Sequence, residues 1–301
     1  MVIQTKLIEE LPVSNELGEG IQWRGSDQTV WWTDILGCTL YRLEWPTKKL
    51  TSYEMPEPLG SFAFTDSHEV IIAGFATGFA FYDLEKRALQ WLHRLKFLTG
   101  EGRLNDGRAD RQGRFWCGSM MARPDVETHA SGRLFSVDSE LILTSHLEGI
   151  NISNGLCWSP DGQIMYFADS LPGKIYQFDF NTADGSLANK RIFAEALEGG
   201  SPDGATVDAA GNVWSAHWGL GKVICFDIMG DIVAEVSIPT SQPSCVAFGG
   251  KNLDLLFVTS AKEGMLEKQL ADEPSAGNVF VYETSVTGLI EPRYCTSQRV
   301  R

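Results

Sequence analysis

The chain has 301 residues, of which 43% are hydrophobic and 21% are charged, and its net charge at pH 7 is −14. This composition can bury a sizeable core and excludes a disordered or fibrous chain, while the acidic balance argues against nucleic acid and anionic membranes as partners. No run approaches the roughly 20 apolar residues of a membrane span, the N-terminus lacks a signal-peptide core, and the six cysteines include no CxxC pair. We expect a cytoplasmic protein and leave its oligomeric state open.

Short runs of aromatic and β-branched residues recur between turn signals along the whole chain, which is typical of strands. Six such runs are Val30–Thr33, Val70–Ala73, Phe115–Cys117, Met165–Ala168, Val213–Ala216 and Leu256–Thr259. A second strand follows each run, at Thr39–Leu43, Gly78–Asp83, Gly132–Asp138, Gly173–Asp179, Gly221–Asp227 and Gly277–Glu283. The last residues of these second strands are separated by 40, 55, 41, 48 and 56 positions. The chain therefore contains six imperfect repeats.

Repeats of 40 to 56 residues with several strands each predict an all-β fold. The expected fold is a six-bladed β-propeller that spans residues 1–301 as a single domain. A blade buries both apolar faces against its neighbours, so the ring must close to be stable. We expect Thr5–Leu11 to complete the last blade beside the 290s, and Ala261–Ala271 to form a helical insertion in that blade. A solenoid or a β-sandwich is the alternative.

Polar residues recur just before or at the start of the first strand of several repeats. They are Glu19, Asp106, Asn154 and Asp203, each followed by glycine. The first strand of a propeller blade lies beside the central channel, so these side chains are expected to form a ring at one level. The alternative is that each caps a turn, because Asn-Asp-Gly and Pro-Asp-Gly are ordinary turn sequences.

Acidic side chains gathered on one axis would repel each other unless a cation lies between them. Carboxylate and amide oxygens suit Ca²⁺, Mg²⁺ or Mn²⁺, with Zn²⁺ and Fe²⁺ as alternatives. The pattern thus predicts one divalent metal ion as the cofactor.

Several motifs, in this order along the chain, resemble the gluconolactonase/regucalcin (senescence marker protein) family of sugar lactonases, and in particular bacterial aldonolactonases. The motifs are Leu17-Gly18-Glu19-Gly20, Arg103-Leu104-Asn105-Asp106-Gly107, Asn154-Gly155-Leu156, Ser159-Pro160-Asp161-Gly162 and Pro202-Asp203-Gly204. The resemblance, which covers about residues 15 to 290, implies a six-bladed propeller. It implies that Glu19, Asn154 and Asp203 bind the metal, that Asp203 is also the catalytic acid/base, and that Arg103 and Asn105 bind substrate.

The sequence departs from this pattern at one place. Some relatives carry an acid that binds sugar hydroxyls shortly after the motif matched by Gly118-Ser119-Met120, but here Met121-Ala122-Arg123 follows. We expect Arg123 to bind an anionic group of the substrate, such as a carboxylate, phosphate or sulfonate; otherwise it lies on a solvated loop. His217 is a further candidate for substrate binding. Asp106 is expected to hold the metal ligands in position without contacting the metal itself.

The reaction that these residues predict is hydrolysis of a γ- or δ-lactone of a sugar acid to the open-chain acid, in a sugar-oxidation pathway. The metal would polarise the carbonyl and Asp203 would transfer the protons. A metal-dependent esterase or phosphotriesterase is the second interpretation, and a non-enzymatic calcium-binding propeller is the third. Arg103 beside the acids argues against the third, because a binding module needs no polar constellation on its axis.

Overall fold

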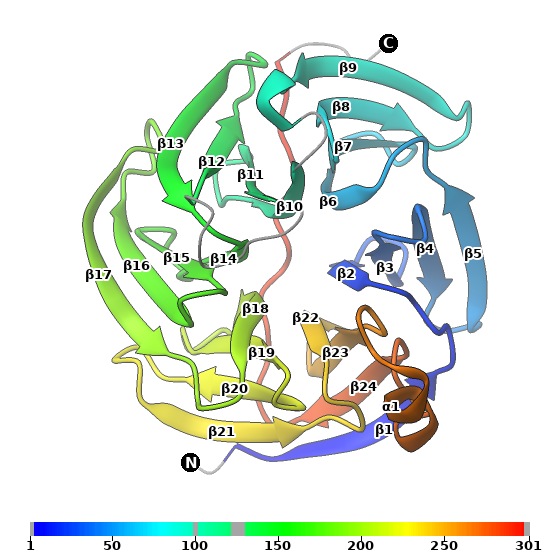
Figure 1. Ribbon diagram of the computed structural model, residues 1–301. Coiled ribbons are helices and arrows are strands. Elements are labelled where there is room, and N and C mark those ends of the chain that lie inside the picture. Colours follow the sequence, from blue (N-terminus) through cyan, green and yellow to red (C-terminus); the bar gives the residue numbers. More distant parts are fainter. Residues whose placement is uncertain (1–2, 99–101, 122–129, 298–301) are drawn as a thin grey trace.

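The computed structural model describes residues 3–98, 102–121 and 130–297. These residues form six antiparallel four-stranded sheets arranged in a ring around a central axis (Figure 1). The prediction of an all-β, six-bladed propeller is therefore confirmed. Within the described residues, no helix has the length and apolar character that a membrane crossing requires.

The strands of each blade follow one another from the axis outward, and we number the blades by their innermost strand. The inner strands of blades 1 to 6 are β2 (Gly18–Arg24), β6 (Leu59–Phe64), β10 (Gly102–Ala109), β14 (Ser153–Trp158), β18 (Ser201–Val207) and β22 (Pro243–Gly249). The second strands are β3 (Thr29–Asp34), β7 (Val70–Phe75), β11 (Phe115–Met121), β15 (Ile164–Asp169), β19 (Val213–Trp218) and β23 (Leu255–Ser260).

The third and outer strands complete the blades. The third strands are β4 (Thr39–Glu44), β8 (Gly78–Asp83), β12 (Gly132–Val137), β16 (Lys174–Phe180), β20 (Lys222–Phe226) and β24 (Val279–Thr284). The outer strands are β5 (Lys49–Glu54), β9 (Ala88–Arg94), β13 (Leu143–Ile150), β17 (Leu187–Glu195), β21 (Ile232–Ser237) and, in blade 6, β1 (Thr5–Leu11). The predicted runs coincide with the second and third strands of all six blades.

Burial decreases from the axis to the rim of each blade. All residues of β2 and β3 are buried, whereas β5 alternates between exposed and partly buried residues. A strand that is covered on both faces needs apolar residues at consecutive positions, while an outer strand has one face in water. This is why the inner part of each blade is readable as an apolar run.

Closure of the ring pairs the first strand of the chain with the last one. Strand β1 pairs with β24, from Thr5 opposite Thr284 to Leu11 opposite Val279. The expected role of Thr5–Leu11 is confirmed, but its partner is β24 and not the 290s. The chain leaves blade 6 after β24, so the 290s are not available as a strand of that blade.

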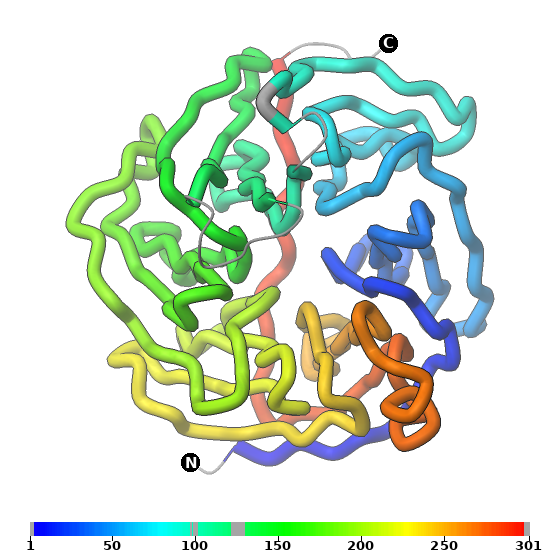
Figure 2. The backbone as a smooth tube through the Cα atoms, in the orientation of Figure 1, coloured from blue at the N-terminus to red at the C-terminus, as the bar shows by residue number. Residues whose placement is uncertain are grey.

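Residues 285–297, which we call the C-terminal strap, cross the ring at the far ends of the inner strands (Figure 2). Gly288 forms a β-bridge with Asp208, directly after β18. The main-chain N–H of Tyr294 donates to the carbonyl of Phe64 at the end of β6, at 2.7 Å. The strap thus links blade 6 to blades on the other side of the axis.

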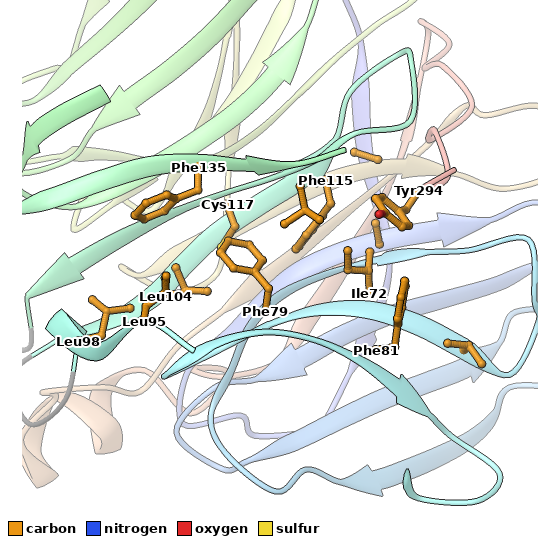
Figure 3. Packing of buried hydrophobic residues seen from close by; sticks show 14 residues of the cluster. Ile72, Phe79, Phe81, Leu95, Leu98, Leu104, Phe115, Cys117, Phe135 and Tyr294 are labelled. Atoms are coloured by element: carbon orange, nitrogen blue, oxygen red, sulfur yellow. The ribbon is translucent and has the colours of Figure 1, made fainter. Parts of the chain in front are cut away.

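Six apolar clusters fill the spaces between neighbouring blades, one for each pair. Figure 3 shows the cluster between blades 2 and 3, where Phe79 of β8 contacts Phe115 and Phe135 of blade 3 edge to face. Tyr294 of the strap belongs to the same cluster and is fully buried. Because no blade can bury its faces alone, the core holds the ring closed.

The insertion between β23 and β24 contains one short helix, α1 (Glu267–Asp272), and a single 3₁₀ turn, η1 (Lys96–Leu98), precedes β10. The sequence predicts a helical insertion over residues 261–271. The insertion is confirmed, but its helix begins at Glu267 and not at Ala261. The main-chain N–H groups of Lys262 and Glu263 both donate to the carbonyl of Glu16, at 3.0 Å. These bonds hold residues 262–263 against blade 1 and leave them outside the helix.

Candidate active site

Every inner strand is irregular near its start. In β2, Glu19 pairs with Thr33 and regular pairing resumes only at Gln22; in β14, the pairing is interrupted in the same way after Asn154. The other four inner strands have a break at the corresponding place. A bulge leaves residues unpaired and turns the strand locally, so it re-aims side chains. The bulges therefore direct polar side chains from the blades toward the axis.

The register of these bulges differs between blades. Pairing in β18 stops at Pro202, which leaves Asp203 unpaired, and pairing in β10 stops at Leu104, which leaves Asn105 and Asp106 unpaired. Asn105 therefore occupies the place that corresponds to Asp203, and Asp106 lies one residue further along its strand. The expectation of one common level does not hold for Asp106, because Asp106 is the second unpaired residue of its bulge, whereas Asp203 is the first and Glu19 and Asn154 are the last paired residues before theirs.

A cavity of about 350 Å³ opens where the inner strands begin. Its described lining comes from five blades and is Leu17, Glu19, Arg103, Asn105, Met120, Ile152, Asn154, Ser170, Leu171, Ser201, Asp203, Trp218 and Glu263. All three predicted metal ligands and two predicted substrate-binding residues thus line one pocket. A second cavity, of about 410 Å³, lies beside the strap and contains none of the predicted residues that the structure describes.

A chain of hydrogen bonds runs across the floor of the pocket. The Arg103 guanidinium donates to Asn105 Oδ1, and Asn105 Nδ2 donates to Asn154 Oδ1 at 2.9 Å. Asn154 Nδ2 donates to Ser170 Oγ at 2.8 Å, and this hydroxyl donates to the carbonyl of Pro202 at 2.7 Å. Each donor fixes the orientation of the next amide, so the chain settles which atom of Asn154 is oxygen.

The two carboxyl groups of the floor are strongly perturbed. Burial raises the pKa of both Glu19 and Asp203, and the charge of Asp106 raises both further. The charge of Glu19 also raises the pKa of Asp203, whereas a side-chain hydrogen bond with Asp203 lowers that of Glu19. Burial lowers the pKa of Arg103, and the charges of Glu263, Glu19 and Asp203 oppose that decrease. Two acids that resist ionisation side by side form a site that a cation would stabilise.

The donor atoms fit a hard divalent cation. Asp203 Oδ1 is buried and has no hydrogen-bond partner among the described residues. With a Glu19 carboxylate oxygen and Asn154 Oδ1 it offers the all-oxygen set that Ca²⁺, Mg²⁺ and Mn²⁺ prefer. In the part of the chain that the structure describes, no group of three His, Cys, Asp or Glu side chains gathers as a metal site, so the amide is needed to complete the set.

Two buried aspartates hold the loops that precede the candidate ligands. Asp34, the last residue of β3, accepts from the main-chain N–H of Leu17 at 3.0 Å, just before β2. Asp169, at the same place in β15, accepts from the main-chain N–H of Ile152 at 3.0 Å, just before β14. The entry of each inner strand is thus fixed by the strand beside it, which positions the bulge and its side chain.

Comparison with known proteins identifies the family. The profile of the SMP-30/Gluconolactonase/LRE-like region matches residues 17–262. The chain belongs to this family. An L-arabinolactonase of Azospirillum brasilense is 38% identical over 95% of this chain and 94% of that protein. A 6-deoxy-6-sulfogluconolactonase of Pseudomonas putida is 33% identical over 92% of this chain and 94% of that protein.

A solved structure supports the same assignment. A calcium-binding protein, regucalcin from Agrobacterium tumefaciens strain C58, superimposes with a TM-score of 0.90 at 27% identity, and the match covers 96% of this chain and 97% of that protein. The resemblance to the gluconolactonase/regucalcin family and the propeller fold are both confirmed.

In this SMP-30/gluconolactonase family member, His217 does not line the pocket. Its side chain is 0% exposed, and its ring packs against Phe226 with the ring centroids 6.0 Å apart. Neither ring nitrogen has a hydrogen-bond partner among the described residues, and burial lowers the pKa of the imidazole to about 4. The neighbouring Trp218 lines the pocket instead.

The remaining candidates fall into two groups. Asp106 accepts a hydrogen bond from the main-chain N–H of Leu156 at 3.0 Å and is not part of the described lining, which agrees with a supporting position. Burial raises its pKa. Arg123 lies outside the described residues.

The sequence reasoning missed Ser170 and Glu263. Ser170 directly follows Asp169 at the end of a predicted strand, so alignment of the second strands of the repeats could have found it. Glu263 comes from the insertion between β23 and β24, which has no counterpart in the other repeats, and no repeat-based signal points to it.

Proposed function

We propose that this protein hydrolyses a sugar-acid lactone to the open-chain acid in a sugar-oxidation pathway, with one divalent cation held by Glu19, Asn154 and Asp203. The observation that carries the proposal is the convergence of these three residues, 184 positions apart at the extremes (203 − 19), in one pocket with Arg103. At the level of enzyme class, the prediction of a lactone hydrolase is confirmed by the curated relatives.

The cation would be held by one oxygen from each of three blades. When bound, it supplies Lewis acidity, which polarises the lactone carbonyl and favours the charge that develops on its oxygen. The name of the calcium-binding regucalcin neighbour supports a divalent ion of this kind. The oxygen donors favour Ca²⁺, Mg²⁺ or Mn²⁺ over Zn²⁺ and Fe²⁺.

Asp203 is the proposed acid/base. One of its carboxylate oxygens takes a proton from the attacking water, the acyl C–O bond of the ring breaks, and the proton is returned to the departing ring oxygen. Water and lactone thus give one hydroxy acid.

Arg103 and Asn105 have complementary parts in substrate binding. The Arg103 guanidinium is directed by its bonds to Asn105 Oδ1 and the Leu104 carbonyl, and it can donate to the lactone oxygens. Both N–H groups of Asn105 are used, by the carbonyl of Ser153 and by Asn154 Oδ1, each at 2.9 Å. Asn105 can therefore only accept a hydrogen bond, from a substrate hydroxyl, through Oδ1.

Arg123 carries the proposal of an anionic substrate. The described lining has one basic side chain, Arg103, and three acidic ones, which are Glu19, Asp203 and Glu263. This part of the lining favours a neutral substrate, whereas Arg123 predicts an anionic one. An Arg123→Ala enzyme that hydrolyses neutral and anionic lactones in the same ratio as the wild type would end the proposal for Arg123.

The test is a pH-drop assay on a panel of γ- and δ-aldonolactones, aryl esters and phosphotriesters, with the spontaneous hydrolysis subtracted. We expect lactones to be the fastest substrates, activity to disappear with chelator and to return with one of the divalent ions. Asp203→Asn is expected to lose at least about a hundredfold in kcat, whereas Asp272→Asn, an exposed residue of α1, should match the wild type. A metal-loaded wild type that is no faster than the background on every lactone would refute the proposal. Faster turnover of aryl esters or phosphotriesters would instead favour the second interpretation.

A further inference from the structure

Glu263 lines the pocket, and both its main-chain N–H and its main-chain carbonyl are hydrogen-bonded. Its N–H donates to the carbonyl of Glu16 at 3.0 Å, and its own carbonyl accepts from Gln242 Nε2 at 3.0 Å. Just before it, Ala261 forms a β-bridge with Leu17 of blade 1. The loop is thus tied to blades 1 and 6, so the main chain from which the Glu263 side chain extends is held at the pocket before any ligand binds.

The Glu263 carboxylate faces the pocket without a partner of its own. Among the described residues it forms no hydrogen bond or ion pair, although it lines the same cavity as Arg103. Of the charges that favour the protonated form of Arg103, that of Glu263 acts most strongly, ahead of Glu19 and Asp203. The carboxylate and the guanidinium thus share one pocket, and the carboxylate still has its hydrogen-bonding capacity for a ligand.

Polar groups are scarce in the rest of the lining. Apart from the hydrogen-bonded chain and the two carboxylates of the floor, only Ser201 and Glu263 have side-chain oxygens in the described lining. The other members are the apolar Leu17, Met120, Ile152 and Leu171, and Trp218, whose indole N–H can donate a hydrogen bond but cannot accept one. Such walls can pack on the C–H face of a small ring, but they offer no acceptor to the hydroxyls of a sugar.

We propose that Glu263 is a specificity residue, whose carboxylate accepts hydrogen bonds from the hydroxyls of the lactone tail. It would select lactones with a neutral hydroxylated tail over those with no hydroxyls and over those with an anionic tail. This inference rests on the proposed lactonase function, because the carbonyl end of the substrate must occupy the floor. A carboxylate that pairs with hydroxyl donors forms the stronger, charge-assisted kind of hydrogen bond, and it repels a second anion.

The experiment compares steady-state kinetics on three substrates of one ring size: a neutral aldono-γ-lactone, γ-butyrolactone, and the γ-lactone of an aldaric acid. Glu263→Ala should raise KM for the aldonolactone about tenfold, which corresponds to loss of one charge-assisted hydrogen bond. Its KM for γ-butyrolactone should stay within about twofold, because that substrate has no hydroxyl to lose. Glu263→Gln should raise kcat/KM for the aldaric lactone about tenfold relative to the aldonolactone.

The matched controls are Glu267→Ala and Glu267→Gln, at an exposed position of the same insertion that does not line the pocket. Both should reproduce the wild-type values on all three substrates. Equal changes on aldonolactone and γ-butyrolactone would show a merely structural role and overturn the inference, as would unchanged kinetics in both Glu263 variants. Either result leaves the lactonase proposal standing, whereas a wild type inactive on all lactones would refute that proposal itself.

Discussion

Replacement of His217 by leucine should make the protein less sensitive to acid. The imidazole is fully buried, and burial lowers its pKa from 6.5 to about 4, so the folded state keeps it neutral over a range in which the unfolded chain takes up a proton. Stability from this group is therefore complete above about pH 6.5 and is lost as the pH falls toward 4. Leucine has no such proton uptake, so the variant should not share the loss.

The magnitude follows from the difference between the two states. A pH of 5 lies 1.5 units below the ordinary histidine pKa of 6.5, so the unfolded chain is protonated at this position while the folded protein is still neutral. At 1.36 kcal/mol per unit, proton uptake by the unfolded chain lowers the free energy of unfolding by about 2 kcal/mol. At pH 7.5 the difference vanishes, and leucine should change the free energy of unfolding by no more than about 1 kcal/mol, because the two ring nitrogens have no partners to lose.

Urea unfolding at pH 7.5 and pH 5.0 measures this, with His68→Leu as the control because His68 is exposed. The wild type and the control should lose about 2 kcal/mol more than His217→Leu between the two pH values. The acidic groups of the pocket contribute equally to all three proteins and cancel. A His217→Leu variant that loses as much stability as the wild type would refute the reasoning. Lactonase activity at pH 7.5 should be retained, and its selective loss in a stably folded variant would assign His217 to substrate binding.

Three further predictions concern positions away from the reacting groups. Asp34→Asn and Asp169→Asn should each weaken binding of the divalent ion about tenfold in equilibrium dialysis, since they hold the loops before two ligands; unchanged affinity in both would show that the loops hold without them. Glu291→Ala leaves the buried Arg108 without its carboxylate partner and should cost about 3–5 kcal/mol in urea unfolding; a loss below about 1 kcal/mol would mean that water reaches Arg108. Tyr294→Ala should cost about 3–5 kcal/mol through the cavity it leaves between blades 2 and 3, whereas Tyr294→Phe, which loses only the hydroxyl bond, should cost about 1 kcal/mol.

The blades could be predicted because the buried residues of their second strands follow one another in the sequence. Val30–Thr33 and Leu256–Thr259 are covered on both faces, so each reads as an apolar run, and six such runs fix the number of blades. Thr5–Leu11 was assigned to the last blade correctly, but its partner strand was not. Pairing with β24 depends on where the chain leaves the blade, which no local pattern encodes.

The pocket was predictable only as far as the repeats extend. The repeat positions of Glu19, Asn154 and Asp203 indicated residues that do line one cavity. The place of Asp106 depends on which residue of β10 is the bulged one, and a sequence does not show strand register. Glu263 lies in an insertion without a counterpart in the other blades, so its position follows from tertiary contacts alone.

The break near the start of each inner strand has a consequence for how such a protein can change. At each break, one or two residues of the inner strand lie outside the hydrogen-bond ladder that holds the sheet, and the side chains of two of them, Asn105 and Asp203, line the pocket. Blade 6 has Ser244 at its place, where blade 5 has Asp203. An exchange of one residue there alters what a bound molecule meets while the main-chain ladder keeps its pairing. A closed ring of this kind can therefore acquire new chemistry one side chain at a time, without refolding the frame that supports it.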